Sequence, residues 1–277
     1  MNEFDLFKDK KKVLALREKI PAEHSIEALA KALRFAVKER ASSLKKCAVL
    51  FSGGVDSSLM ALALKDFTEP ILYCAGTGNS KVFPRARKNA KLLGLKLREV
   101  PIKEADFPKL KKETVSIIGT DEKMQVSIAL PVLAALKAVK SDGIETVFSG
   151  TGADELFCGY REFSTVLKQK GYMAVELLCW SKLDEMFGRN LKREIALLGN
   201  VSLNAFDPFL DERFVLEAMA FPAEEKILSP EDELRKIPLR ELAKFMGLPE
   251  SICLEKKKAI QFDSGSAKEL SRLAKQN

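Results

Sequence analysis

The sequence has very little histidine and no closely spaced cysteine pair. Its 277 residues include one histidine, His24, and five scattered cysteines with no CxxC spacing. A single histidine excludes two-histidine metal sites and argues against serine–histidine catalysis. The cysteine pattern indicates neither a disulfide framework nor a zinc ribbon, so we expect buried, reduced thiols. Any catalysis must therefore depend on carboxylates, lysines, backbone amides or a bound metal.

The sequence also lacks long apolar runs and a strong excess of charge. Its longest apolar stretch, residues 127–139, is too short and too interrupted to span a bilayer, and the first residues lack the apolar region of a signal peptide. We therefore expect a cytoplasmic protein that does not bind a membrane. The net charge is +7, and the lysine clusters at 8–12, 109–113 and 255–259 are typical of solvated surface, which argues against a nucleic-acid partner.

Short apolar runs alternate with helical patterns over the first 150 residues. This alternation predicts βαβ units, and hence an α/β fold with a Rossmann-like parallel sheet flanked by helices. Pro131 should kink or divide the helix that contains it. The predicted strands cover residues 47–51, 71–76, 96–102 and 144–150, and the predicted helices cover 25–43, 57–65, 83–94 and 125–140.

The pattern divides the chain into three parts. Residues 1–24 are predicted to be a charged lead-in without a well-specified structure. Residues 25–160 form the α/β core that would bind the nucleotide. Residues 161–277 contain helical spacing and no clear strand, so we expect a mostly helical part that packs on the carboxyl edge of the sheet and completes the active site.

Two glycine-containing turns follow predicted strands and should meet at that edge. They are SGGVDSS at 52–58 and SGTGADE at 149–155, and ligands of open parallel sheets bind there. In the first turn, the missing side chains of Gly53 and Gly54 allow backbone N–H groups to approach an anion closely. The following helix directs its positive N-terminal end toward the same point. Further donors could come from the hydroxyls of Ser52, Ser57 and Ser58.

The first turn is not one of the common phosphate-binding loops, because it lacks the lysine and spacing of a Walker A motif and the pattern GxGxxG. It resembles the pyrophosphate loop (PP-loop) of N-type ATP pyrophosphatases. This resemblance implies that the β- and γ-phosphates of ATP leave as pyrophosphate while the α-phosphorus is attacked, giving AMP. Asp56 would repel phosphates unless a cation lay between them, which indicates Mg²⁺; alternatively, Asp56 only caps the helix.

Three further segments identify a family resemblance. SGTGADELFCGY at 149–160, the segment beginning DPFLD at 207–227 and KKKAIQFDSGSA at 256–267 occur in order after the PP-loop. Together, the four segments resemble the synthetase domain of the asparagine synthetase family, to which β-lactam synthetase is related. The resemblance implies a sheet of the adenine nucleotide alpha hydrolase type, with ATP and Mg²⁺ as cofactors.

The resemblance also implies roles for individual residues. Asp56 and Asp154 would share magnesium-bound pyrophosphate, and Asp154 and Glu155 form the carboxylate pair of the second turn. Lys257 or Lys258 would be the active-site lysine, the alternative being a solvated basic helix end. Contacts to ATP, where ordinary core packing is the alternative, are expected from Leu50, Phe51, Ser52, Gly53, Gly54, Val55, Ser57, Ser58, Tyr73, Cys74, Ala75, Gly76, Gly150, Gly152, Ser264 and Gly265.

The sequence departs from the family pattern on the acceptor side. Asn2 stands where a glutaminase domain would have its nucleophilic cysteine, and only 46 residues precede the first predicted strand, so we expect no glutaminase domain. Thr151 replaces a glutamate that the family uses to help the attacking amine. Phe206 replaces an arginine, which affects recognition of the carboxylate substrate, and Cys158 replaces a glycine.

These features predict an ATP-dependent carbon–nitrogen ligase that forms AMP and pyrophosphate. Aspartate or a similar small carboxylic acid would be adenylated and then attacked by ammonia or another amine. Ammonia would come from solution or from a separate glutaminase or other ammonia-supplying chain, and a homodimer is left open. The alternatives are a protein that binds ATP or AMP for regulation without amidation, and a PP-loop enzyme that modifies tRNA.

Overall fold

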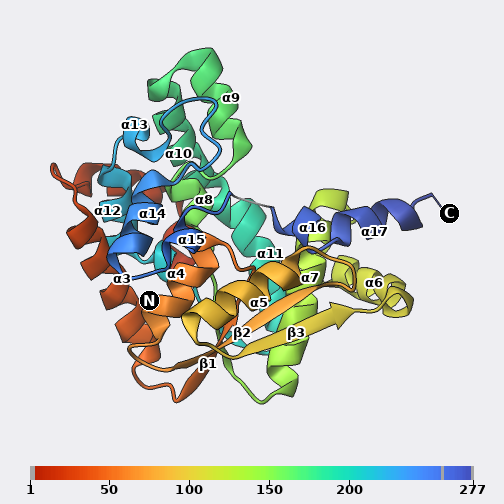
Figure 1. Cartoon of the computed structure of the whole chain (residues 1–277). Helices are drawn as coiled ribbons and strands as arrows, with labels where there is room; N and C mark the ends of the chain where they lie inside the picture. Colours follow the sequence, from red (N-terminus) through yellow and green to blue (C-terminus); the bar gives the residue numbers. More distant parts are fainter. Residues whose placement is uncertain (1–3, 257–258, 276–277) are drawn as a thin grey trace.

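A five-stranded parallel sheet forms the centre of the molecule. The computed structural model describes residues 4–256 and 259–275 (Figure 1). The strand order is β3-β2-β1-β4-β5, and every neighbouring pair is parallel. This confirms the predicted α/β fold class. The strands are β1 (Lys46–Leu50), β2 (Glu69–Thr77), β3 (Leu97–Ile102), β4 (Thr146–Phe148) and β5 (Asn204–Phe206).

The strand order changes direction at β1, and this places the candidate site. The chain builds outward from β1 to β2 and β3, then crosses back and adds β4 on the other side of β1. The connections after β1 and β4 therefore leave neighbouring strands in opposite directions and open a crevice between them. Such a switch point is where open α/β sheets bind ligands.

Helices cover both faces of the sheet (Figure 1). Ala48 and Val49 are consecutive in β1 and fully buried, so each face of the strand packs against a core. The core on the Val49 side includes α3 (Ile26–Ala41), α4 (Val55–Leu64) and α5 (Val82–Leu93). The core on the Ala48 side includes α6 (Phe107–Ile118) and α7 (Lys123–Ser141), which follow η2 (Glu104–Asp106).

Helix α7 is long and apolar enough to cross a membrane by length and composition alone. In this fold it packs on the sheet, with Leu130 and Leu133 fully buried. Pro131 lies inside α7 and does not divide it. The expectation of a division is therefore wrong. The ring of Pro131 is itself buried, so packing favours a helix that proline alone would weaken.

The part after residue 160 is mostly helical, but the expectation that it contains no strand is wrong. Strand β5 pairs with β4, with Val147 opposite Ala205 and Phe148 opposite Phe206. The helices are α8 (Ala153–Leu156), α9 (Arg161–Lys170), α10 (Tyr172–Met186), η3 (Phe187–Leu191), α11 (Lys192–Val201), η4 (Pro208–Leu210), α12 (Glu212–Ala220), α13 (Ala223–Lys226), α14 (Ile237–Phe245), α15 (Glu250–Cys253), α16 (Ile260–Asp263) and α17 (Ser266–Leu273).

The lead-in is more ordered than predicted. It forms α1 (Phe4–Phe7), α2 (Lys10–Leu16) and η1 (Arg17–Lys19). Val13 and Leu16 are three residues apart on α2 and buried in the main core, which anchors this charged segment by one apolar stripe. The predicted state of the cysteines is confirmed, because all five are free and buried.

The packing of α3 can be tested with two leucines of different exposure. Leu33 is fully buried in α3, whereas Leu14 in α2 is 47% exposed. Leu33→Ala should lower the free energy of unfolding by roughly 2–5 kcal/mol, because it leaves a cavity. Leu14→Ala should change it by about 0.5 kcal/mol or less. Urea unfolding followed by circular dichroism measures both values, and equal effects would contradict the core described here.

Candidate active site

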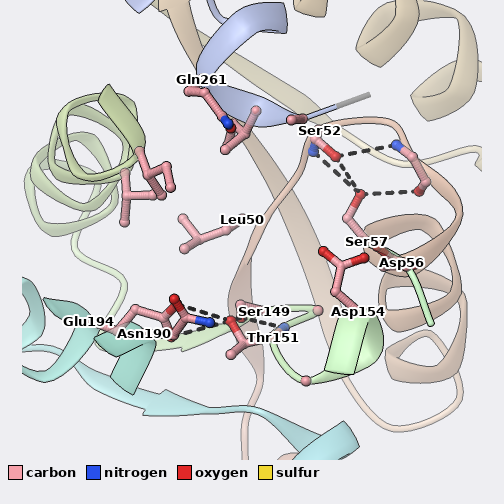
Figure 2. Close-up of a pocket in the computed structure, with 18 of the residues that line it drawn as sticks. Leu50, Ser52, Asp56, Ser57, Ser149, Thr151, Asp154, Asn190, Glu194 and Gln261 are labelled. Carbon is pink, nitrogen blue, oxygen red and sulfur yellow. Dashed lines mark hydrogen bonds between the residues drawn. The ribbon is translucent and has the colours of Figure 1, made fainter. Parts of the chain in front are cut away.

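A cleft of about 760 Å³ opens at the carboxyl ends of β1 and β4. Both glycine-containing turns line it, as does the apolar face of α7 that includes Ile128, Val132 and Leu136. Residues of η3 and α11 close one end, and the segment before α14 closes another. Figure 2 shows the two turns, with Ser52 and Ser57 on one side, Ser149 and Thr151 on the other, and Asp56 and Asp154 beside each other.

The first turn is held rigidly by its own side chains. The Ser57 hydroxyl donates to the Gly54 carbonyl (3.2 Å), and the Gly54 N–H donates to Ser52 Oγ (3.3 Å). From α5, Asn89 Nδ2 donates to the Gly53 carbonyl (2.7 Å) and Arg85 Nε donates to the Ser52 carbonyl (2.9 Å). These bonds fix the conformation of the turn and engage the carbonyl oxygens of residues 52–54.

Helix α4 begins at the end of this turn and adds a positive end. Its first residue follows Gly54, which has no side chain that could cap the helix. No side-chain cap from elsewhere in the described chain replaces it. The N–H groups of the first helical turn are thus available to an anionic ligand. Gly53 has φ of +75°, and a Cβ there would lie 3.2 Å from the backbone of Ala86, so only glycine suits this position.

The second turn packs directly against the first. A Cβ on Gly150 would lie 3.1 Å from the Cβ of Asp56. Gly152 has φ of +98°, and a Cβ there would lie 2.5 Å from Leu210 Cδ2. Gly150 therefore allows the tips of β1 and β4 to touch, which brings Asp56 and Asp154 to the same place (Figure 2), and Gly152 allows the second turn to pack on η4.

Lys236 lies between these two carboxylates. Its Nζ is 2.7 Å from Asp56 Oδ2 and 2.6 Å from Asp154 Oδ1, and its side chain is 1% exposed. Burial by itself lowers the pKa of Lys236, but the charges of Asp154 and Asp56 outweigh burial and raise it overall. The lysine is therefore charged, and both carboxylates face one cation.

Gly159 packs so closely against this ionic cluster that no other residue fits at its position. A Cβ on Gly159 would lie 1.9 Å from Asp154 Oδ1 and 2.3 Å from Lys236 Cε. Such distances are far inside van der Waals contact, so a larger residue would have to displace the carboxylate or the lysine. Gly159 belongs to the segment after α8 that the sequence analysis had noted only as part of a motif.

The two carboxylates have the chemistry of a Mg²⁺ site in a phosphate complex. Among residues 4–256 and 259–275, no group of three or more His, Cys, Asp or Glu side chains could hold a metal ion. Magnesium commonly uses one or two carboxylates, with phosphates and water completing its shell. Asp56 Oδ1 is buried and has no hydrogen-bond partner in the described structure, as expected of an atom that awaits a ligand. The residues present thus fit the group.

The other end of the cleft contains a second polar network. The Ser149 hydroxyl donates to Asp207 Oδ1 (2.5 Å) and lies 2.8 Å from Thr151 Oγ1. The Thr151 hydroxyl faces Glu194 of α11, and its Oγ1 is 3.2 Å from each carboxylate oxygen (Figure 2). A carboxylate from α11 therefore contacts Thr151, the residue that replaces a glutamate of the family pattern.

The surroundings of Glu194 change its acidity. Burial raises the pKa of the Glu194 carboxyl to about 7, although the positive charge of Arg193 and the hydrogen bond from Thr151 oppose the rise. The negative charge of Glu155 also raises the pKa of Glu194. Glu194 is thus a carboxyl group that gains and loses a proton near neutral pH.

Glu155 is built into the wall of the cleft. Its side chain is buried, and Oε1 accepts hydrogen bonds from the Tyr160 hydroxyl (2.5 Å) and from Asn190 Nδ2 (2.9 Å). These bonds join α8 to α9 and to η3. The five residues of η3 form a π-helical turn, which brings Asn190 into the cleft, and such turns are frequent at functional sites.

The structure brings most of the predicted residues together. Five of the predicted residues that it describes do not line the cleft, namely Gly53, Ser58, Gly76, Ser264 and Gly265. The Ser264 carbonyl accepts from the Thr77 N–H at the end of β2 (2.8 Å). Lys257 and Lys258 lie outside the described residues. The predicted residues that line the cleft are Leu50, Phe51, Ser52, Gly54, Val55, Asp56, Ser57, Tyr73, Cys74, Ala75, Gly150, Gly152, Asp154 and Glu155.

Sequence reasoning missed Lys236, Glu194 and Asn190. Lys236 is one lysine in a lysine-rich chain, 180 residues from Asp56. Glu194 and Asn190 lie in helical segments in which a polar residue most often faces solvent. The one usable signal was Thr151, because a missing carboxylate at that position invites a search for another one nearby.

The sheet, the switch point and the two turns define an adenine nucleotide alpha hydrolase type of fold with a PP-loop. The sequence model described as Asparagine synthase matches residues 28–199 and 167–277. The chain therefore belongs to the asparagine synthase family, whose members use ATP. The predicted family resemblance is confirmed.

Individual relatives agree with this assignment. A Methanocaldococcus jannaschii protein named "Putative asparagine synthetase (glutamine-hydrolyzing) 1" is 30% identical over 306 residues, covering 99% of this chain and 56% of the relative. An asparagine synthetase domain-containing protein of Saccharomyces cerevisiae is 26% identical over 85% of this chain and 52% of its own length. The chain thus spans about half the length of these curated relatives.

Solved structures are less similar. The NMN synthetase of Francisella tularensis has a TM-score of 0.46 and 11% identity, covering 87% of this chain and 78% of that one. A U34-tRNA thiolase of Methanococcus maripaludis has a TM-score of 0.43 and 13% identity, covering 90% of this chain and 75% of that one.

The ionic cluster can be tested by removing its cation. Lys236→Met should lower the free energy of unfolding by roughly 3 kcal/mol, because it leaves two adjacent carboxylates without a partner. Adding Asp154→Asn to this variant should restore part of the loss by removing the repulsion. Lys256→Met, which breaks an exposed ion pair with Glu233, should cost about 1 kcal/mol or less. Thermal and urea unfolding measure these values, and a Lys236→Met protein as stable as Lys256→Met would contradict the cluster.

Proposed function

We propose that the protein is an ATP-dependent carbon–nitrogen ligase that forms AMP and pyrophosphate. A carboxylic acid is adenylated at the α-phosphorus of ATP, and ammonia or an amine then attacks the resulting acyl-adenylate. The observation that carries this proposal is the convergence of Asp56 and Asp154 on one cation position beside the PP-loop. Membership of the asparagine synthase family supports the type of reaction.

The two ends of ATP suit different parts of the cleft. The β- and γ-phosphates would lie on the N–H groups of residues 52–58 and the start of α4. The adenine ring suits the apolar wall formed by Leu50, Ile128, Val132 and Leu136. This orientation directs the α-phosphorus toward the middle of the cleft, between the first turn and the end that contains Thr151.

Asp56 and Asp154 would hold Mg²⁺ bound to the two outer phosphates. When bound, the ion supplies positive charge that makes pyrophosphate a better leaving group. Lys236 contacts both carboxylates and so holds them side by side at the place where the ion would bind. One of Lys257 and Lys258 would provide further positive charge near the bridging oxygen of the α-phosphorus.

Basic side chains at the other end of the cleft could pair with a second negative group of the acid. They are Arg161, Arg189 and Arg193, whereas Lys182 is held by Glu162 (2.7 Å), and acidic side chains line this end as well. Phe206, which replaces an arginine of the family pattern, is not among the lining residues and instead has Arg40 stacked over its ring at 5.4 Å. A dicarboxylic acid such as aspartate is therefore the first candidate. Ammonia, from solution or supplied by a glutaminase, is the first candidate for the nitrogen donor.

Isotope exchange between pyrophosphate and ATP tests the first half-reaction. Exchange should depend on Mg²⁺ and on one acid from a panel of carboxylic acids, with aspartate tested first. Asp56→Asn and Asp154→Asn should each lower the exchange rate roughly 100-fold or more, because the leaving pyrophosphate loses its counter-charge. Asp66→Asn, which removes an exposed carboxylate paired with Arg34, is the matched control and should leave the rate unchanged.

Two results would contradict the proposed function. One is the formation of ADP instead of AMP. The other is the absence of exchange with every acid although AMP binds tightly, which would favour a regulatory nucleotide-binding protein.

A further inference from the structure

We propose that Glu194 is the catalytic base that takes the proton from the attacking amine, and that Thr151 positions its carboxylate. This inference depends on the proposed function, since it concerns the second half-reaction at the same site. It assigns the step to α11, an element outside the motifs that identify the family.

The position of Glu194 supports this role. Its side chain is 21% exposed, and the carboxylate lines the cleft opposite the second turn. Thr151 lies three residues before Asp154, so the hydroxyl that holds Glu194 belongs to the turn that contributes to the phosphate end of the site (Figure 2). A nucleophile that approaches an acyl group at the middle of the cleft would therefore pass close to this carboxylate.

The other carboxylates that line the cleft are already engaged. Asp56 and Asp154 bind Lys236. Glu155 accepts from Tyr160 and Asn190, and Asp207 accepts from Ser149 while only 2% exposed. By contrast, Glu194 accepts from a neutral hydroxyl, and the guanidinium of Arg193 is 3.9 Å away.

Further out, Glu162 is paired with Lys182 (2.7 Å) and Glu185 accepts from Ser181 (3.1 Å). Glu255 lies beside the first turn, where it accepts from Asn89 (3.2 Å). Glu194 thus combines three properties, namely access to the cleft, a place beside the second turn and weak pairing. A base needs these properties, because a close cation would reduce its affinity for a proton.

The step is balanced without any further reagent. The nitrogen lone pair attacks the carbonyl carbon of the acyl-adenylate and forms the C–N bond. The nitrogen loses one proton to the Glu194 carboxylate. The bond between the carbonyl carbon and the phosphate oxygen breaks, and AMP leaves with the electron pair. The Glu194 carboxylic acid then releases its proton to water.

The acidity of Glu194 suits a base that works at neutral pH. Burial raises its pKa to about 7, and the charged groups that act on it are Arg193 on its own helix and Glu155 on α8. A base must be ionised to accept a proton. The rate of amide formation should therefore rise as the pH increases through about 7, once it is expressed per unprotonated amine.

The test compares amide formation with pyrophosphate exchange in the same variant, using the acid that supports exchange and ammonium chloride as the amine source. Glu194→Gln should lower the ratio of amide formation to exchange by roughly 100-fold or more. Glu194→Asp should fall between wild type and Glu194→Gln. Glu113→Gln removes a carboxylate of α6 that is 32% exposed and lies outside the cleft, and its ratio should equal that of wild type. Thermal unfolding verifies that each variant is folded.

Two further readouts separate a catalytic role from a structural one. The pH dependence near 7 should disappear in Glu194→Gln. Hydroxylamine is a weaker base than ammonia and loses its proton more readily after attack, so its reaction should fall less in this variant than that of ammonia.

The outcomes distinguish this inference from the proposed function. If wild type shows exchange but Glu194→Gln lowers exchange and amide formation equally, the inference is overturned and the ligase assignment stands. Equal losses with ammonia and hydroxylamine, or an unchanged pH profile, would also overturn it. If wild type shows no exchange with any acid, both the proposed function and the inference fail.

Discussion

The ion cluster of Lys236 with Asp56 and Asp154 is the interaction on which the rest of the site depends. It joins three elements that are distant in sequence, namely the turns after β1 and β4 and the start of α14. One positive charge faces two negative charges, so the cluster keeps a net attraction for a second cation. The sheet alone would bring two carboxylates together at a high electrostatic cost. The buried lysine offsets that cost and so permits an arrangement that is useful only when phosphates and a metal are present.

Close packing of backbone is the second requirement of the site. The reversal of strand order puts β1 and β4 side by side, and Gly150 allows their turns to pack closely, because a Cβ there would lie 3.1 Å from that of Asp56. Gly159 leaves the space that the Asp154 carboxylate and the Lys236 side chain occupy. Glycine here acts on the electrostatics of the site as well as on the conformation of the chain.

Sequence could predict the sheet and the carboxylates, because both depend on local patterns. Strand β1 is a short apolar run, and Asp56 follows it within a turn whose composition favours an anion-binding loop. Strand β5 escaped prediction because none of its three residues is buried, whereas the three residues of β4 all are. Lys236 and Glu194 could not be predicted, since their roles arise from contacts between segments that are far apart along the chain. No periodicity or motif records such contacts, and only the assembled fold reveals them.

The span of 180 residues between Asp56 and its lysine partner has a consequence for biosynthesis. A ribosome makes the chain from the N-terminus, so β1, β4 and their turns emerge well before the segment that leads into α14. Until that segment is released, the two acidic turns repel each other and have no resident ammonium group. The nascent protein should therefore keep this edge of the sheet open, and the cleft would close only after the segment before α14 has emerged and docked.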